Sequence, residues 1–256
     1  MIYPHLEVQR YRILEPLAFL FLIQIWRKYR SNICLRQIKG IFGFSSQKSI
    51  PLVSMNFLAH LYLSGTDEKL MVGNYLADLL NKKSLEKFDK NIQAGVFLHR
   101  SIDSFTDNHP QVLEACALLR PKHHKYAPIL VDIFFDYFLV LNWTHFSTES
   151  FTDFRKRAYG VLISHTEGFP EKVAYQTERM IGGDWLFSYG HEEGIDFVLH
   201  KLEQRVSKPD QIKGGLESLI EHKKKLNELF MSFFPSLIKE CINLGAKINL
   251  QSEVKS

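Results

Sequence analysis

The chain has 256 residues and a formal net charge of +4, and the excess of Lys and Arg lies almost entirely in residues 1–54. Those residues hold eight Lys or Arg against two Glu, a net of +6, which leaves −2 for residues 55–256. A nearly neutral body argues against a general nucleic-acid-binding protein, which needs a basic face on its folded part. The three cysteines lack CxxC spacing, which excludes a zinc ribbon and a disulfide scaffold and favours a reducing, cytoplasmic setting.

The apolar run at residues 14–26, LEPLAFLFLIQIW, is too short to cross a membrane, since a spanning helix needs about 20 apolar residues. A signal peptide or a membrane-surface anchor over residues 14–30 is the alternative, but RKYR follows at once and no A-x-A-like cleavage site is present. We interpret residues 1–54 as an N-terminal extension, either a tail or the product of a misassigned start codon. Met55 is then the true start of a domain over 55–250.

Beyond Met55 the apolar residues recur mostly every three to four positions, a pattern typical of helices. Pro110 suits the first turn of one helix, Ser147 or Thr148 suits the start of another, and the stretch SKPD at 207–210 marks a break. The sequence therefore predicts a single all-α domain. The expected helices cover residues 56–64, 69–80, 86–105, 110–119, 123–145, 148–164, 170–182, 191–205 and 210–245.

Two carboxylates interrupt the apolar helix PILVDIFFDYFLVLNW. Asp132 and Asp136 are its only charges, and because they are four residues apart they share one helix face. An ionised carboxylate among Ile, Leu, Val and Phe is costly unless it is paired or binds a metal, and two such groups repel each other. A nearby cation would resolve both problems. The alternative is a face that reaches solvent, or pairing of each Asp with Arg or Lys.

The stretch HRSIDSFTDNHP places His99, Asp103 and Asp107 at positions i, i+4 and i+8, so one helix face carries an imidazole and two carboxylates. Histidine with carboxylates suits Mn²⁺, Fe²⁺ or Zn²⁺, whereas carboxylates alone favour Mg²⁺ or Mn²⁺. The simpler alternatives are that Asp107 caps the helix beginning at Pro110 and that Arg100 pairs with a surface Asp.

Two more segments place ionisable groups on apolar helices. His60 lies in NFLAHLYL, and Asp78 ends the apolar face of GNYLADLL, where Gly73 permits close approach of another helix. Taken singly, His60 could be an ordinary core histidine and Asp78 an ordinary polar residue near a helix end. All four segments fall within about 80 residues, so they can converge on one buried site, as metal ligands do in helical bundles.

Four stretches in this order, MNFLAHLYLS, GNYLAD, GVFLHRSIDSFTDNHP and ILVDIFFDYFLVLNW, resemble the acyl carrier protein phosphodiesterase family, a distant relative of the HD-domain metal-dependent phosphohydrolases. The resemblance extends over about residues 55–247 and implies an HD-like helical domain. It also implies hydrolysis of the phosphodiester that joins 4′-phosphopantetheine to a serine of holo-acyl carrier protein, with manganese the expected cofactor and Mg²⁺ or Fe²⁺ as alternatives. The core motif has His99 and Asp103 in place of a contiguous His-Asp pair, which leaves the ligand set open.

With this activity in view, we expect a bound divalent cation to activate water and to bind a phosphoryl oxygen. Asp132 would be a further ligand or would orient one, Arg100 would neutralise phosphate charge, and His60 would be a general acid or base or another ligand. Thr106 and Asp107 would fix the loop at the helix end. The expected metal ligands are Asp78, His99, Asp103 and Asp136.

Acyl carrier proteins are acidic, so a local basic patch should bind the substrate protein. The candidates are Lys122 and Lys125 in PKHHK, Arg155 and Arg157 in RKR, and the stretch HKKK at 222–225, although each could be an ordinary solvated helix face. Two other functions remain open: an HD-type phosphohydrolase acting on a nucleotide or another small phosphoester, and a non-catalytic helical module that binds carrier protein. No nucleic-acid partner is expected, and membrane association is not favoured.

Overall fold

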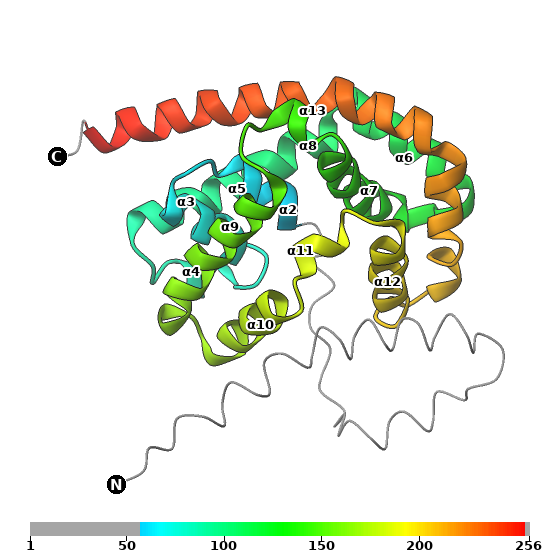
Figure 1. The fold of residues 1–256 in the computed structure, drawn as a ribbon. Coiled ribbons are helices and arrows are strands. Elements are labelled where there is room, and N and C mark those ends of the chain that lie inside the picture. Colours follow the sequence, from blue (N-terminus) through cyan, green and yellow to red (C-terminus); the bar gives the residue numbers. More distant parts are fainter. Residues whose placement is uncertain (1–56, 254–256) are drawn as a thin grey trace, which may run out of the picture. The chain divides into compact units, whose positions relative to one another are not determined.

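Residues 57–253, which the computed structural model describes, form helices joined by turns, and side chains are described for residues 57–245. No β-strand occurs in that range, so the all-α prediction is confirmed. The predicted extension, residues 1–54, lies outside the described residues. In chain order (Figure 1) the elements are α2 (Phe57–Leu63), α3 (Glu68–Leu76), α4 (Lys82–Leu85), α5 (Lys90–Asn108), α6 (Pro110–His123), η2 (His124–Tyr126), α7 (Ala127–Leu141), α8 (Trp143–Phe146), α9 (Phe151–His165), η3 (Thr166–Gly168), α10 (Glu171–Gly182), α11 (Trp185–Ser188), α12 (Glu192–Glu203), η4 (Pro209–Gln211) and α13 (Gly215–Glu253).

Capping side chains set several helix starts. Asp89 accepts hydrogen bonds from the backbone N–H groups of Asn91 and Ile92, so α5 begins at Lys90 and not at residue 86 as predicted. Ser150 caps α9 by accepting from an N–H of the first turn, which places the start later than Ser147 or Thr148. In both cases a polar side chain further along the chain satisfies the free N–H groups of the first turn.

The predicted helix over 123–145 is wrong in two respects: the chain bends at its start, and near its end it divides into α7 and α8. His124 has a φ of 49°, which ends α6, and Pro128 lies in the first turn of α7, where its missing N–H costs nothing. The sequence placed a break between residues 119 and 123, and the structure moves it a few residues along the chain, to His124.

The core forms around α7, whose residues are buried on nearly all sides. This helix packs against α6, α13, α2 and α12. Burying each large aromatic side chain contributes on the order of 2–3 kcal/mol of transfer free energy. The largest fully buried aromatic side chains are Tyr75, Phe134, Phe138, Phe154, Phe230 and Phe234.

The longest helix is α13, which runs along α6, α7 and α5 and also contacts α12 (Figure 1). It begins only after Gly214, whose φ of 74° turns the chain out of η4, so the helix predicted over 210–245 starts five residues later. None of the helices in the described range combines the length and the apolar character that a membrane span requires. The apolar segment at 14–30 falls among the residues that are not described.

The closest helix crossing joins α3 and α5 through two glycines. A Cβ added to Gly73 would lie 1.9 Å from the carbonyl oxygen of Ile92, and one added to Gly95 would lie 2.3 Å from that of Leu70. A side chain at either position would clash with backbone atoms of the other helix, so the backbones themselves are in contact. The expectation that Gly73 permits close helix approach is confirmed, and this crossing brings the polar residues of α3 onto those of α5.

Candidate metal centre

Two histidines and one aspartate come together where α2 meets α5. His60 and His99 are 5% and 4% exposed, and their rings stack with centroids 4.2 Å apart. Asp103 lies one turn after His99 and directs one carboxylate oxygen to each ring: Oδ1 is 3.4 Å from Nε2 of His60, and Oδ2 is 3.2 Å from Nε2 of His99. One ligand atom from each of the three residues lies within 4.8 Å of the others, close enough to hold a single metal ion.

Asp78, just beyond the C-terminal end of α3, completes one side of this cluster. Its Oδ1 is 3.0 Å from Nε2 of His99. The contact depends on the glycine crossing, because α3 must approach α5 closely for a side chain as short as Asp to reach the imidazole. Of the metal ligands predicted from sequence, the fold therefore groups Asp78, His99 and Asp103 and adds His60.

Asn74 belongs to the same cluster and was not among the residues predicted from sequence. Its Oδ1 lies 2.9 Å from Nδ1 of His60 and 3.0 Å from Nδ1 of His99. Its amide nitrogen donates to the backbone oxygen of His60 and to Oγ of Ser64. The available signal was its place in GNYLAD, four residues before Asp78 and therefore on the same helix face.

The carboxylates and the imidazoles shift each other's protonation. Burial alone would lower the pKa of His99, but hydrogen bonds and charge from Asp103 and Asp78 outweigh burial and raise that pKa to about 9. Burial would likewise raise the pKa of Asp103, yet His60 and His99 hold it well below its usual range. In the metal-free protein, His99 is therefore a buried imidazolium held between two carboxylates, and a bound cation would take over that positive charge.

Asp136, predicted as a ligand, lies at the N-terminus of α2 instead. Its Oδ2 accepts from the N–H of Leu58 at 3.2 Å and its Oδ1 from that of Ala59 at 2.9 Å, so both oxygens satisfy first-turn donors. Burial raises its pKa to about 7 despite these two hydrogen bonds. The carboxylate fixes the start of the helix that carries His60, which makes it a positioning group for that histidine.

Asp132 lies one turn before Asp136 on α7 and faces the acidic side of the cluster. No hydrogen bond to its carboxylate occurs within the described part of the chain, and burial raises its pKa well above the usual range. The negative charges that raise it further are those of Asp136, Asp107, Asp103 and Asp78. A carboxylate in this position is one that a cation would stabilise.

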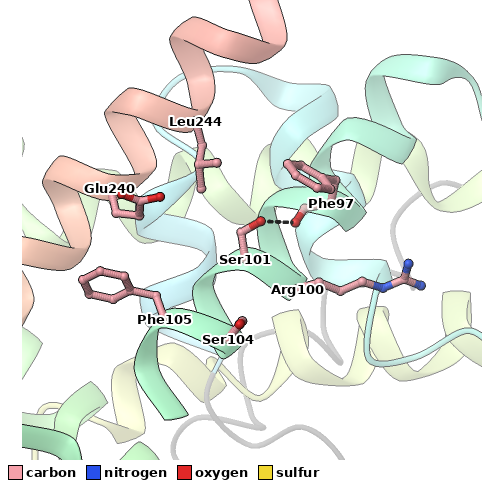
Figure 2. Close-up of a pocket in the computed structure, with 7 residues that line it drawn as sticks. All are labelled: Phe97, Arg100, Ser101, Ser104, Phe105, Glu240 and Leu244. Carbon is pink, nitrogen blue, oxygen red and sulfur yellow. Dashed lines mark hydrogen bonds between the residues drawn. The ribbon is translucent and has the colours of Figure 1, made fainter. Parts of the chain in front are cut away.

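Arg100 follows His99 on α5 but lies on a different helix face. It lines a hollow of about 450 Å³ between α5 and α13 together with Phe97, Ser101 and Leu244. Figure 2 shows its side chain pointing away from Leu244. Its predicted role in neutralising phosphate charge therefore stays a prediction.

The two predicted arginines of the basic patch are held by acidic partners within the chain. Arg155 pairs with Asp184, and only 12% of its side chain is exposed. Arg157 makes a two-pronged contact with Glu149, with Nε to Oε1 at 3.1 Å and Nη2 to Oε2 at 2.8 Å. Their charges are largely neutralised, and both side chains support the packing of α9.

The two predicted lysines of the patch are bound to uncharged groups. Nζ of Lys122 donates to the backbone oxygen of Gly214 at 2.9 Å, and Nζ of Lys125 donates to Oγ of Ser207 at 3.3 Å. Both residues are exposed. Their positive charges consequently remain available to an acidic protein.

The donors at this centre fit a divalent cation. Both histidines turn Nδ1 toward Asn74 and Nε2 toward Asp103, so the Nε2 atoms and the carboxylates converge on the same space. Imidazole nitrogen with carboxylate oxygen is a ligand set of Mn²⁺, Fe²⁺ and Zn²⁺ sites. The group formed by the two buried histidines and the exposed Asp103 could hold such an ion.

Comparison with known proteins places the chain in a family. The family model described as acyl carrier protein phosphodiesterase matches residues 55–237. Proteins of that name from Enterobacter sp. (strain 638) and from Photorhabdus laumondii are each 30% identical over 190 residues, which cover 74% of this chain and 98% and 96% of theirs. The protein from Escherichia coli O6:H1 is also 30% identical, over 73% of this chain and 97% of its own. No solved structure matches. The chain belongs to the acyl carrier protein phosphodiesterase family.

Proposed function

We propose that this protein hydrolyses the phosphodiester between 4′-phosphopantetheine and the serine of holo-acyl carrier protein. Water adds across the bond between phosphorus and the serine oxygen, which gives the serine hydroxyl of apo-carrier protein and free 4′-phosphopantetheine. The observation that carries this proposal is the His60, His99 and Asp103 group, which lies inside the region matched by the family and has the composition of a phosphohydrolase metal site.

The cofactor we propose is a divalent cation, Mn²⁺ first and Mg²⁺ or Fe²⁺ as alternatives. Its ligands would be Nε2 of His60, Nε2 of His99 and the carboxylate of Asp103, with Asp78 beside them. When bound, such a cation lowers the pKa of a coordinated water and polarises a phosphoryl oxygen. His60 thus takes the role of a ligand, the second of the two roles considered from sequence.

The remaining residues of the cluster act on charge and position. We assign Asp132 as a further ligand or as a partner that orients one, because burial and the neighbouring carboxylates raise its pKa well above the usual range, and a cation would stabilise its charge. Asp136 holds the N-terminus of α2 and so keeps His60 in place. For Arg100 we propose that its guanidinium neutralises the negative charge of the substrate phosphate.

The carrier protein would bind through exposed lysines, two of which follow the metal centre closely along the chain. Besides Lys122 and Lys125, we propose Lys82 and Lys83 of α4, which are exposed and have no carboxylate partner among the described residues. They follow Asp78 by only four and five residues, so their Cα atoms lie within roughly 18 Å of its Cα even along a fully extended chain. Positive charge at that distance would attract an acidic protein toward the site.

The test is a mass measurement on the carrier protein. Full-length enzyme with Mn²⁺ and holo-acyl carrier protein should convert the holo form to the apo form, and a chelator should stop the conversion. Asp103→Asn should abolish it, whereas Asp210→Asn, which changes an exposed carboxylate paired with Lys213, should not. Hydrolysis of small phosphodiesters without loss of the pantetheine arm would overturn the carrier-protein assignment, and binding of carrier protein without metal or turnover would indicate a binding module.

A further inference from the structure

We propose that Asn74 is the positioning residue for both histidine ligands, and that its single carboxamide oxygen fixes the two imidazoles so that each presents Nε2 to the metal. The inference rests on the proposed metal-dependent function and adds a residue to its machinery. Among the described residues, Asn74 is the one side chain that makes a hydrogen bond to Nδ1 of both rings.

The orientation of the Asn74 amide is set by its other contacts. Its Nδ2 lies 2.8 Å from the backbone oxygen of His60, which can only accept, and 3.0 Å from Oγ of Ser64. That hydroxyl donates its own proton to the His60 oxygen at 2.9 Å, so it accepts from Asn74. Turning the amide over would place Oδ1 against the backbone oxygen, where two acceptors would face each other.

Because the amide orientation is fixed, Oδ1 of Asn74 is the atom that faces both imidazoles. Oδ1 is an acceptor with two lone pairs, and it receives one contact at 2.9 Å from Nδ1 of His60 and one at 3.0 Å from Nδ1 of His99. Both Nδ1 atoms must therefore carry a proton. When a metal ion is bound and both imidazoles are neutral, the lone pair of each ring is therefore on Nε2, the atom that faces Asp103.

Burial makes this arrangement hard to replace. Asn74 is 1% exposed, so no bulk water can stand in for its oxygen. The residue sits directly after Gly73, at the point where α3 and α5 touch, which holds its side chain against His99. Removing a group that orients a metal-bound histidine in this way commonly lowers metal affinity 10–100-fold.

The first measurement uses the full-length wild type and needs no variant. Long-range ¹H–¹⁵N spectra of the histidine rings with bound Zn²⁺, a diamagnetic probe, should show the proton on Nδ1 for both His60 and His99. A proton on Nε2 of either ring would overturn the proposal. Binding of Mn²⁺ is measured separately by calorimetry.

The second measurement compares Asn74→Ala with a matched variant, Asn142→Ala. Asn142 also donates two side-chain hydrogen bonds at 2.8 Å, to the backbone oxygen of Phe138 and to Asn227, but it lies at the end of α7. We expect Asn74→Ala to weaken Mn²⁺ binding 10–100-fold and Asn142→Ala to leave it unchanged. Equal Mn²⁺ affinity of Asn74→Ala and wild type would overturn the proposal.

Failure of the inference and failure of the proposed function give different results. If the wild type binds Mn²⁺ through Nε2 but leaves holo-carrier protein intact, the role of Asn74 stands and the substrate assignment fails. If the wild type binds no Mn²⁺ at all, both fail. If Asn74→Ala does not fold, the ring spectra of the wild type still decide the question.

Discussion

Substitution at the glycine crossing between α3 and α5 tests whether the close packing of these two helices positions the residues of the metal centre. In Gly95→Ala the new Cβ would lie 2.3 Å from the carbonyl oxygen of Leu70 and 2.8 Å from Cα of Gly73, against 3.4–4 Å for ordinary contact. Both atoms belong to backbone, so no side chain can rotate away. Relief requires the two helices to separate by about 1 Å, the difference between the built and the ordinary contact.

The magnitude follows from two opposing effects. Overpacking typically costs about 1–3 kcal/mol, and a clash with backbone belongs at the upper end of that range. Alanine also improves the intrinsic helix propensity by about 1 kcal/mol relative to glycine. The free energy of unfolding should therefore fall by about 2 kcal/mol, a loss that a domain of ordinary stability survives.

The control is Gly160→Ala in the middle of α9, where an added Cβ meets nothing within 4 Å. That change should raise the free energy of unfolding by about 0.5–1 kcal/mol, since only the propensity term applies. Urea unfolding of the two variants and the wild type measures both effects. Gly95→Ala should also weaken Mn²⁺ binding, because separating the helices pulls Asp78 and Asn74 away from His99. A Gly95→Ala protein as stable as the wild type would refute the close-packing argument.

Three further predictions concern the residues around the centre. Asp136→Asn turns an amide N–H₂ toward one of the N–H groups of α2, so two donors face each other. We expect the free energy of unfolding, measured in urea, to fall by about 1–3 kcal/mol and Mn²⁺ binding to weaken. Unchanged stability would contradict the capping role of Asp136. In the metal-free protein the pKa of His99 is about 9 against an ordinary 6.5, so the folded state holds this proton more tightly than the unfolded state. The resulting stability is present in full below pH 6.5 and is lost as pH rises through about 9, a decrease of at most about 3 kcal/mol that should be absent in His99→Gln. The double variant Lys82→Glu and Lys83→Glu should raise KM for holo-acyl carrier protein and reduce the salt dependence of KM, with kcat unchanged. Lys172→Glu on α10, where the lysine is also exposed, should change neither quantity. Equal KM values for the double variant and the wild type would show that α4 does not bind the carrier protein.

The sequence by itself determined the helical class and the main parts of the site, because both depend on short-range spacing. Apolar residues every three to four positions define helices wherever the chain buries one face, and the i, i+4 relation of His99 and Asp103 follows from helix geometry alone. A histidine and carboxylates on otherwise apolar helices also indicated a metal, since their burial needs a compensating charge. Gly73 was expected to permit a close crossing, and it does.

Only the tertiary structure decided which polar groups meet, because spacing along one helix carries no information about its neighbours. Asp132 and Asp136 have the same surroundings in the sequence, since both lie on one face of an apolar helix. The packing of α2 against α7 gives Asp136 two backbone donors and leaves Asp132 facing the other carboxylates. The sequence predicted that Arg155 and Arg157 form a basic patch, but in the folded chain they pair with Asp184 and Glu149. Asn74 carries no charge to attract notice, and its role exists only because α3, α2 and α5 bring two imidazoles to one carboxamide oxygen.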